Sequence, residues 1–319
     1  MTAALLADVG GSKTRLALAN STGPPDRIVV IENDTVADLE TAVAQYLDHT
    51  GEHPKAATFA IAGPIQAEEI ALTNRPWRFR RSEFARRFGF SQFRVVNDFE
   101  AVAWALPRLT AAETQPLGAS TLRPAGVKIV LGPGTGLGVA ALLQADGHAF
   151  VVASEGGHVS FGARSREEDD LFVRLRQQYG HISAETVLSG PGLLRLARTL
   201  HPERSYGAPE GIVTDARAGD AAAHEIARVF VRLLGRFAGD VALTFKALGG
   251  VYITGGVASG LGPLLAAPEF RDAFEQHPPY ENLLREIPTL LVTSREPGLI
   301  GCAALAQMSP TVSATPQPG

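Results

Sequence analysis

The feature that most constrains the fold is a pattern that occurs twice in the chain. The segments LLADVGGSKTRLALA, which begins at Leu5, and IVLGPGTGLGVAALL, which begins at Ile129, each place a glycine-rich turn between two apolar runs. Apolar runs bounded by turn residues are typical of strands, so each segment predicts a β-hairpin that opens one domain. Two such hairpins predict two related domains, and 319 residues exceed the usual size of a single hydrophobic core.

The other segments predict strands and helices that alternate along the chain, which favours an α/β fold with mixed sheets. Composition becomes loop-like between Pro107 and Ala119, where we place the domain boundary. The further predicted strands are Ile28–Ile31, Thr58–Ala62, Ile70–Leu72, Phe93–Val96, Phe150–Val152, Val251–Thr254 and Thr289–Thr293. The main predicted helices are Val36–Leu47 (with Thr35 as N-cap and Gly51 at its end), Glu167–Tyr179, Gly192–Leu200, Ala221–Ala247 and Leu299–Gln307.

The composition excludes several classes of protein. A net charge of −4 gives no general attraction to nucleic acid or to an anionic membrane, and no segment has the apolar length of a membrane span. The single cysteine, Cys302, excludes an internal disulfide and a cysteine-based zinc site, and it fits a reducing compartment. The start MTAALLADVGG lacks a basic region, so we expect no signal peptide and a cytoplasmic enzyme. The Pro-rich tail, residues 310–319, is expected to be flexible.

Both glycine-rich turns are candidates for phosphate binding, because glycine lets backbone N–H groups approach an anion without a Cβ atom in the way. Asp8, just before the first turn, is suited to hold Mg²⁺ through water. Two ordinary hairpin turns are the alternative, since one glycine-rich turn is a weak signal and neither turn matches the P-loop pattern. The candidate donors are Gly10, Gly11 and Ser12 in the first turn and Gly134, Thr135 and Gly136 in the second.

A third glycine pair, Gly255–Gly256, follows a predicted buried strand and opens a helix. A surface without side chains at that point would admit a purine ring or a phosphate group at the helix N-terminus. Close packing of the helix on the strand is an alternative explanation that needs no ligand.

Asn97 and Asp98 stand where an apolar strand gives way to a run of helix-forming residues. Both residue types are favoured helix N-caps, which is the ordinary explanation for such a pair. The carboxyl edge of a parallel sheet is also where open α/β proteins bind ligands, which is the functional explanation. The residues alone leave both explanations open.

Several motifs, in the same order over essentially the whole chain, resemble the sugar kinases of the hexokinase–actin–Hsp70 superfamily. The resemblance is closer to the proteobacterial-type glucokinase family. The matching motifs are the Asp-x-Gly-Gly-Ser that starts at Asp8, Asn97–Asp98, GPGTGLG, GGVYITGG, LTNRPW (Leu72–Trp77), SEGGHVSF (Ser154–Phe161), SAETVLSGPGL (Ser183–Leu193) and PGLIGCAAL (Pro297–Leu305).

This resemblance implies a role for each candidate residue. Asp98 corresponds to the general base that takes the proton from the sugar 6-hydroxyl, and Asn97, Asp98, Glu155, His158 and Glu185 correspond to sugar ligands. Carboxylates and an imidazole suit a ring of hydroxyl groups that both donate and accept hydrogen bonds. As alternatives, the EGGH segment is a surface turn and Glu185 lies in an exposed first helical turn near Ser183.

The resemblance also implies a two-lobed fold of the actin-like, ribonuclease-H-like ATPase class, with a mixed sheet in each lobe and a central cleft. The implied ranges are a small lobe at 1–109, a large lobe at 110–297, and a helix at 298–309 that returns to the small lobe. ATP and Mg²⁺ are the implied cofactors, glucose the implied substrate, and a homodimer the implied assembly. The ROK sugar kinases carry a cysteine-rich zinc motif after Glu-x-Gly-His, and its absence here argues against that branch and against zinc.

Three other functions are alternatives to that of a glucokinase. The first is the same chemistry on another hexose, such as fructose, mannose or glucosamine. The second is a non-catalytic sugar sensor, which is disfavoured because Asp8, Asp98 and both candidate phosphate turns are present. The third is an NAD-dependent dehydrogenase. It is disfavoured because this sequence has no acidic residue at the strand end that would follow a GxGxxG motif and bind the ribose.

Overall fold

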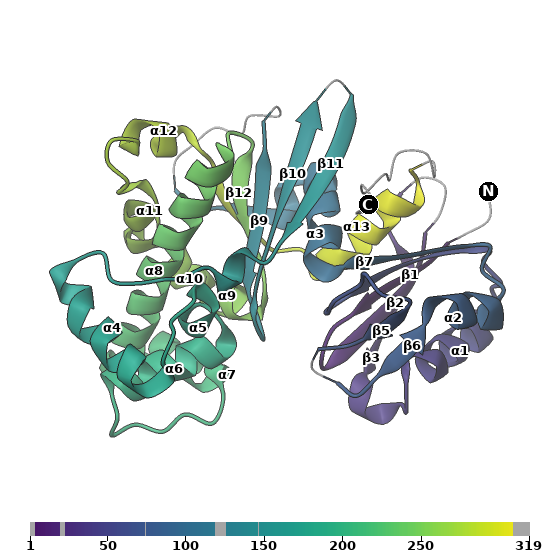
Figure 1. Cartoon of the computed structure of the whole chain (residues 1–319), viewed down its shortest axis with the longest axis horizontal. Coiled ribbons are helices and arrows are strands. Elements are labelled where there is room, and N and C mark those ends of the chain that lie inside the picture. The colour runs from purple at the N-terminus through teal and green to yellow at the C-terminus, as the bar shows by residue number, and fades with distance from the viewer. Residues whose placement is uncertain (1–3, 20–22, 74, 119–125, 146, 309–319) are drawn as a thin grey trace. The chain divides into compact units, whose positions relative to one another are not determined.

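The computed structural model describes residues 4–19, 23–73, 75–118, 126–145 and 147–308 (Figure 1). The chain forms two compact units, Met1–Arg108 with Arg295–Gly319 and Leu109–Ser294. The sequence-based ranges end the first unit at residue 109, one residue later than in the structure. They end the second unit at residue 297, three residues later than in the structure. The predicted flexible tail, residues 310–319, lies outside the described residues.

The first unit contains a five-stranded sheet in the order β3-β2-β1-β4-β7. Strands β1, β2 and β3 are antiparallel, and β1, β4 and β7 are parallel. The register aligns Val9 with Ile61 and Ile61 with Asn97, so the parallel strands end at one edge of the sheet. The strands are β1 (Ala4–Val9), β2 (Lys13–Ala19), β3 (Asp26–Glu32), β4 (Ala56–Ile61) and β7 (Gln92–Asn97), and a small hairpin is formed by β5 (Glu69–Ala71) and β6 (Arg78–Arg80).

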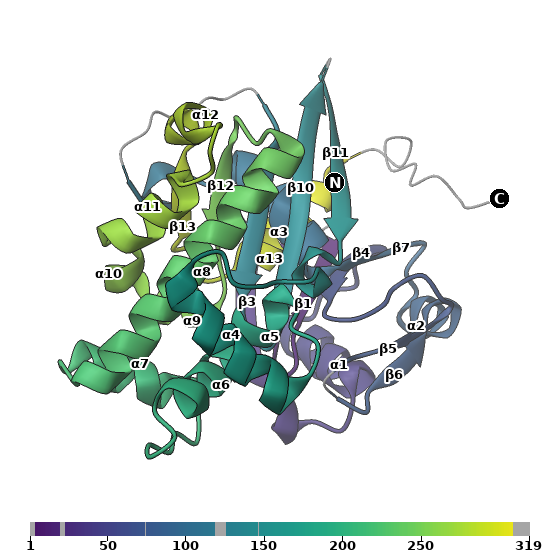
Figure 2. The same cartoon turned by 60° about the vertical axis from the view of Figure 1, so that its left-hand side comes forward.

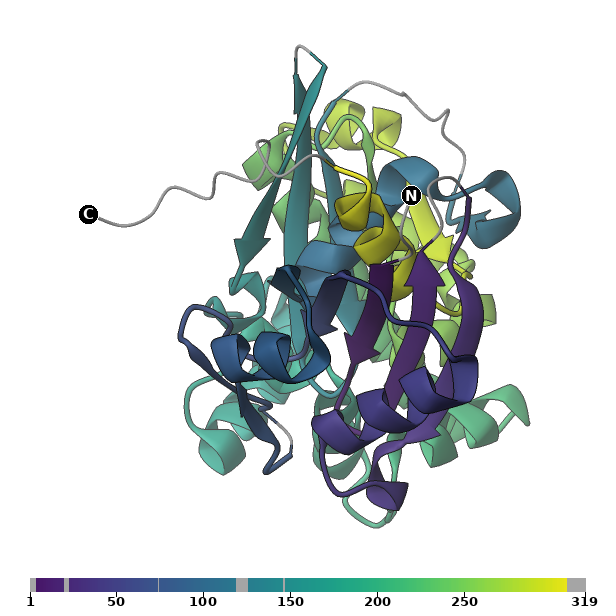
Figure 3. The same ribbon diagram turned by 90° about the vertical axis from the view of Figure 1, so that its right-hand side faces the viewer.

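Alternate side chains of β1 enter two different hydrophobic cores, as the period of two in a strand requires. Leu5 and Val9 pack with α1 (Leu39–Thr50) and α2 (Arg81–Phe88) on one face of the sheet. Leu6, on the other face, packs with α3 (Asp98–Ala105) and α13 (Pro297–Ala306). Figure 3 turns this unit toward the viewer. Helix α13, which follows the second unit in the chain, thus completes a core of the first unit.

The second unit contains a six-stranded sheet in the order β11-β10-β9-β12-β13-β8, seen obliquely in Figure 2. Strands β9, β12 and β13 are parallel, whereas β8, β10 and β11 run antiparallel to their neighbours. The strands are β8 (Thr114–Pro116), β9 (Lys128–Pro133), β10 (Leu137–Ala145), β11 (His148–Ser154), β12 (Gly250–Ile253) and β13 (Thr289–Val292).

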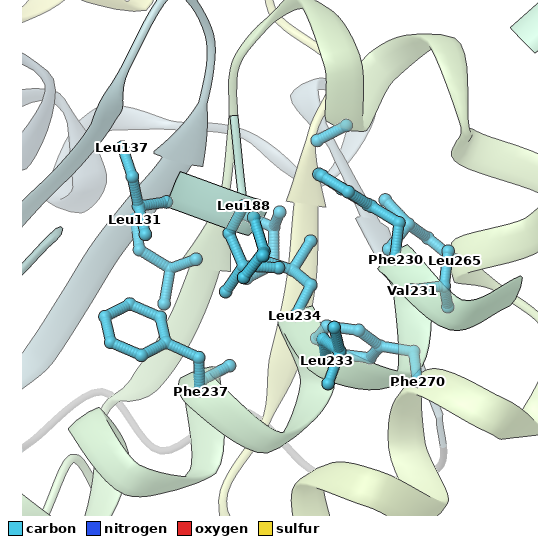
Figure 4. Close-up of a cluster of buried hydrophobic side chains, with 14 of the residues drawn as sticks. Leu131, Leu137, Leu188, Phe230, Val231, Leu233, Leu234, Phe237, Leu265 and Phe270 are labelled. Atoms are coloured by element: carbon cyan, nitrogen blue, oxygen red, sulfur yellow. The ribbon is translucent and has the colours of Figure 1, made fainter. Parts of the chain in front are cut away.

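A layer of helices packs against one face of this sheet through a single large core. Phe230, Leu234 and Phe237 of α8 lie in one cluster with Leu131 of β9 and Leu137 of β10 (Figure 4). The helices of the unit are α4 (Arg166–Tyr179), α5 (Ala184–Val187), α6 (Gly190–Leu200), α7 (Pro209–Arg217), α8 (Ala221–Phe245), α9 (Gly256–Gly260), α10 (Gly262–Leu265), α11 (Pro268–Glu275) and α12 (Glu281–Glu286). In the described parts of the chain, no helix has the length and apolar character needed to cross a membrane.

Both predicted opening hairpins are confirmed, as β1–β2 and β9–β10. The predicted start of the first helix is wrong, because α1 begins at Leu39 and its N-cap is Asp38. The Asp38 carboxylate accepts the N–H of Thr41 at 2.7 Å, whereas the Thr35 hydroxyl donates to the Glu32 carbonyl. The predicted end is confirmed, since Gly51 adopts a left-handed conformation with φ of 68°.

Candidate active site

Asn97 ends β7 at the carboxyl edge of the first unit's sheet and is also the N-cap of α3. Its side-chain oxygen accepts the N–H of Phe99 at 2.9 Å and that of Glu100 at 3.4 Å. The capping explanation is therefore correct for Asn97. The cap fixes the direction in which α3 leaves the sheet, and thereby the position of its first residue, Asp98.

Asp98 is a half-buried carboxylate at the first position of α3. Burial raises the pKa of Asp98 to about 6, and the negative charge of Asp8 acts in the same direction. The N–H of Phe99, which donates to the Asp98 carboxylate at 3.0 Å, opposes the shift. A carboxylate that titrates near neutral pH is ionised at pH 7 and is more basic than an ordinary aspartate. These are the properties required of a general base.

Asp8 lies one residue before the end of β1, and its side chain is only 20% exposed. Burial raises the pKa of Asp8, Arg15 at 3.7 Å opposes this shift, and the charge of Glu296 adds to it. The first turn of α13 approaches closely, since a Cβ atom on Gly298 would lie 2.8 Å from the Asp8 carboxylate. The absence of a side chain at Gly298 therefore leaves room for this carboxylate.

The surroundings of Asp8 fit a magnesium ion bound with few protein ligands. Among the residues that the structure describes, no group of three or more His, Cys, Asp or Glu side chains is arranged to hold a metal. Magnesium in phosphoryl-transfer enzymes keeps several waters and uses one or two carboxylates together with substrate phosphates. A carboxylate destabilised by its burial and by the charge of Glu296 would gain from a nearby cation.

The first glycine-rich turn is held by residues distant in sequence. The side-chain amide of Asn33 donates to the carbonyls of Gly10 at 2.8 Å and of Gly11 at 3.2 Å. The guanidinium of Arg75 also donates to the Gly11 carbonyl, at 3.2 Å. No sequence motif assigns a role to Asn33 or to Arg75, although Arg75 lies within LTNRPW. Lys13 forms an exposed ion pair with Glu32 at 2.8 Å.

In the second unit, three glycine-containing segments converge. The Gly134 carbonyl of the β9–β10 turn accepts the N–H of Gly190, the first residue of α6, at 2.7 Å. Gly255 packs so closely that a Cβ atom there would lie 2.5 Å from the Pro133 carbonyl, and its φ of 97° also favours glycine. Gly256, the first residue of α9, is exposed and has no atom within 4 Å of its Cβ position.

The close-packing explanation therefore accounts for Gly255, whereas Gly256 leaves an open surface. Beside it, the second turn is closed by a hydrogen bond of 2.8 Å from the N–H of Gly134 to the carbonyl of Gly136. Thr135, between them, is exposed. The open surface at Gly256 and this turn together are suited to a nucleotide, since helix N-termini and glycine turns both attract anions.

The segments that carry Glu185, Glu155 and His158 meet at the start of β10. The Glu185 carboxylate accepts the N–H of Leu137 at 2.8 Å, so it lies against the second turn and is half-buried rather than exposed. The EGGH segment approaches the same residue, since a Cβ atom on Gly157 would lie 2.1 Å from the Leu137 carbonyl.

The EGGH side chains are accessible to a ligand, and the backbone that follows them is held in place. Glu155 is 90% exposed and His158 is 61% exposed, and their nearest charged atoms are 3.9 Å apart. The backbone after them is fixed to the start of α5, because Ala184 donates its N–H to the Val159 carbonyl at 3.0 Å. A rigid turn that presents an acid and an imidazole is consistent with hydroxyl recognition as well as with a surface turn.

Two α/β units with mixed sheets, each opened by an antiparallel hairpin around a glycine-rich turn, define the class of actin-like ATPase and sugar-kinase folds. Comparison with known proteins narrows this class. The Glucokinase family model matches residues 5–309. The chain is 39% identical over 311 residues to a glucokinase from Rhizobium johnstonii, which covers 95% of this chain and 91% of that protein. This chain therefore belongs to the glucokinase family.

Two further comparisons extend this result. The chain is 40% identical over 307 residues to a bifunctional protein glk from Burkholderia lata, covering 94% of this chain and 48% of that protein. It thus spans about half the length of such bifunctional relatives. The crystal structure of a glucokinase from an Antarctic psychrotroph matches with a TM-score of 0.87 and 32% identity, over 96% of this chain and 98% of that one.

Proposed function

We propose that this protein transfers the γ-phosphoryl group of ATP to the 6-hydroxyl of glucose, with Asp98 as the general base. The observation that carries the proposal is the position and pKa of Asp98. It is a half-buried carboxylate at the carboxyl edge of the sheet, with a pKa raised to about 6. Phosphoryl transfer requires positioning and charge stabilisation more than covalent chemistry, so the chemical role left to a side chain is to orient the hydroxyl and accept its proton. Membership of the glucokinase family supports the choice of substrates.

The other candidate residues have the following proposed roles. Asn97, Glu155, His158 and Glu185 hydrogen-bond the sugar hydroxyls, and the absence of Lys and Arg from this set suits a neutral sugar. Asp8 would hold magnesium, through water, and the bound ion would neutralise phosphate charge. The residues proposed to bind ATP are Gly10, Gly11, Ser12, Gly134, Thr135, Gly136, Gly255 and Gly256.

Two broader expectations belong to the same proposal. The family resemblance supports a homodimer, which sedimentation at several protein concentrations would measure. A cytoplasmic location is supported by Cys302, which is fully buried as a free thiol in the first unit's core.

The substrate is tested with glucose, mannose, fructose and glucosamine, each supplied with Mg·ATP, by measuring kcat/KM from ADP release and from hexose phosphate. The highest value is expected for glucose. A higher value for another hexose would keep the chemistry and change the substrate. Sugar binding without turnover for any of the four would instead support a non-catalytic sensor.

The pKa of Asp98 sets a pH dependence for the activity. The base must be ionised, so kcat/KM for glucose should be constant above pH 7 and fall about tenfold per pH unit below the pKa of about 6. The measurement is a pH profile from 5 to 9 in overlapping buffers at fixed free Mg²⁺. A value that stays constant down to pH 5 would contradict the assignment of Asp98.

Glu155→Gln tests the sugar site. The substitution keeps the size of the side chain but removes its charge, so the KM for glucose should rise about tenfold while that for ATP stays within twofold. Glu203→Gln, at another exposed glutamate of the same unit, is the matched control and should change neither constant. An unchanged KM for glucose in Glu155→Gln would remove Glu155 from the site.

A further inference from the structure

All three carbonyls of the first glycine-rich turn accept hydrogen bonds from residues outside it. Asn33 supplies donors to each of them, with its side-chain amide to Gly10 and Gly11 and its backbone N–H to Ser12 at 2.8 Å. Asn33 is fully buried, and its side-chain oxygen accepts the hydroxyl of Thr14 at 2.7 Å. A buried amide that satisfies both of its ends fixes the plane of each peptide group it contacts.

Peptide geometry determines where the N–H groups of the turn point. A trans peptide is planar, and its C=O and N–H bonds point in opposite directions. When the carbonyls of Gly10 and Gly11 are directed at Asn33, the N–H groups of Gly11 and Ser12 are directed away from it. The turn therefore presents two adjacent N–H groups on the side opposite to Asn33, as in an anion-binding nest.

Arg75 lies on the same carbonyl side of the turn as Asn33. Its side chain is 17% exposed, and its guanidinium carbon lies 4.8 Å from the centre of the Trp77 ring. One terminal nitrogen donates to the Gly11 carbonyl at 3.2 Å and the other pairs with Asp34 at 2.7 Å. Its buried Nε atom has no hydrogen-bond partner among the described residues.

The ion pair with Asp34 does not explain why Arg75 is held in this way. Asp34 is 91% exposed, and exposed ion pairs contribute little to stability. The contact with Gly11, by contrast, brings a largely buried cation to within one peptide group of the N–H groups that would receive a phosphate. From the carbonyl side, its charge adds to the positive potential at the N–H groups one peptide away. The shared Gly11 carbonyl fixes the peptide that carries the N–H of Ser12.

We propose that Arg75, together with Asn33, is a positioning residue for the terminal phosphate of the nucleotide. It acts through the peptide between Gly11 and Ser12 and not by direct contact with the sugar. This inference rests on the proposed function, because it assumes that the first turn receives a phosphate. It adds two residues that no phosphate-binding motif in the sequence contains.

The test is Arg75→Met, which keeps an unbranched side chain that can pack on Trp77 but removes the charge and the donor to Gly11. The dissociation constant for Mg·AMPPNP, measured by calorimetry, should rise about tenfold, as should the KM for ATP. The dissociation constant for glucose should stay within twofold. Arg75→Lys keeps the charge without the planar fork of the guanidinium. Its dissociation constant for Mg·AMPPNP should therefore lie between those of the wild type and of Arg75→Met.

Two control variants separate this role from a general structural one. Arg78→Met makes the same change at a nearby arginine that is 69% exposed and pairs with Glu69, and it should leave both dissociation constants unchanged. Asp34→Asn removes the exposed partner of Arg75 but not its contact with Gly11, and it should also leave them unchanged. Melting temperatures of all variants establish that they are folded.

Equal weakening of glucose and AMPPNP binding in Arg75→Met, or unchanged AMPPNP binding, would overturn the inference. Failure of the proposed function gives a different result. In that case the wild-type protein phosphorylates no hexose, whereas the effect of Arg75→Met on AMPPNP binding is still measured directly.

Discussion

Asp98→Asn should lower kcat for glucose about 10²- to 10⁴-fold while leaving the dissociation constant for glucose within about threefold, the range expected for loss of a general base. The amide is nearly isosteric with the carboxylate and keeps an oxygen that can accept the N–H of Phe99, so α3 should start as before. It cannot take a proton from the sugar. Single-turnover kinetics with calorimetric sugar binding would separate the two effects.

The same variant should be more stable than the wild type at high pH. The folded-state pKa of Asp98 is about 6, above its ordinary value of 3.8, so ionisation of Asp98 costs more in the folded state than in the unfolded state. That cost is fully present above pH 6 and disappears as pH falls toward 4. The gain in Tm for Asp98→Asn should follow the same window, largest at pH 8 and absent at pH 4.

Asp48→Asn, at an exposed aspartate of α1 in the same unit, is the matched control and should change neither kcat nor Tm. Normal turnover in Asp98→Asn would remove the general-base assignment. Loss of turnover together with a lower Tm at pH 8 would mean that Asp98 mainly supports the structure.

Gly301→Ala should have the largest effect on stability. In α13, a Cβ atom on Gly301 would lie only 1.7 Å from the carbonyl oxygen of Ala101 in α3, far inside any allowed contact. The two helices must separate to accept a methyl group, and overpacking of this kind costs on the order of 3 kcal/mol or more. Because α3 begins at Asp98, the separation should also lower kcat.

Gly211→Ala is the matched control for this prediction. Gly211 lies inside α7, and its nearest atom to an added Cβ is 3.5 Å away in the Tyr206 ring, an ordinary contact. Alanine is the better helix former, so this variant should be unchanged or slightly more stable. Thermal and urea unfolding measure both variants. A Gly301→Ala protein as stable as the wild type would mean that the close contact between α3 and α13 is not required.

The sequence predicts well those elements that are determined by residues close together in the chain. Both opening hairpins follow from apolar runs around glycine turns, and the end of α1 follows from Gly51. The sequence predicts too early a start for α1, because both Thr35 and Asp38 are acceptable N-caps. Only the structure shows which oxygen accepts a backbone N–H. Local patterns therefore identify helix ends better than they select between neighbouring caps.

The contacts that complete the candidate site join residues that are far apart in the sequence, so sequence patterns do not reveal them. Asn33 reaches the first turn from the end of β3, and Gly190 reaches the second from the start of α6. Likewise, nothing near Glu185 in the sequence indicates that its carboxylate accepts the N–H of Leu137. Each contact depends on how distant segments pack, which only the folded chain determines.

The most direct test of the proposed activity is to follow ATP, ADP and sugar phosphate together by ³¹P NMR after adding wild-type protein to glucose and Mg·ATP. We expect one glucose 6-phosphate for each ADP, and no ADP above background when 6-deoxyglucose replaces glucose. ADP release without sugar phosphate, or phosphate at a position other than the 6-hydroxyl, would contradict the proposal that Asp98 activates that hydroxyl.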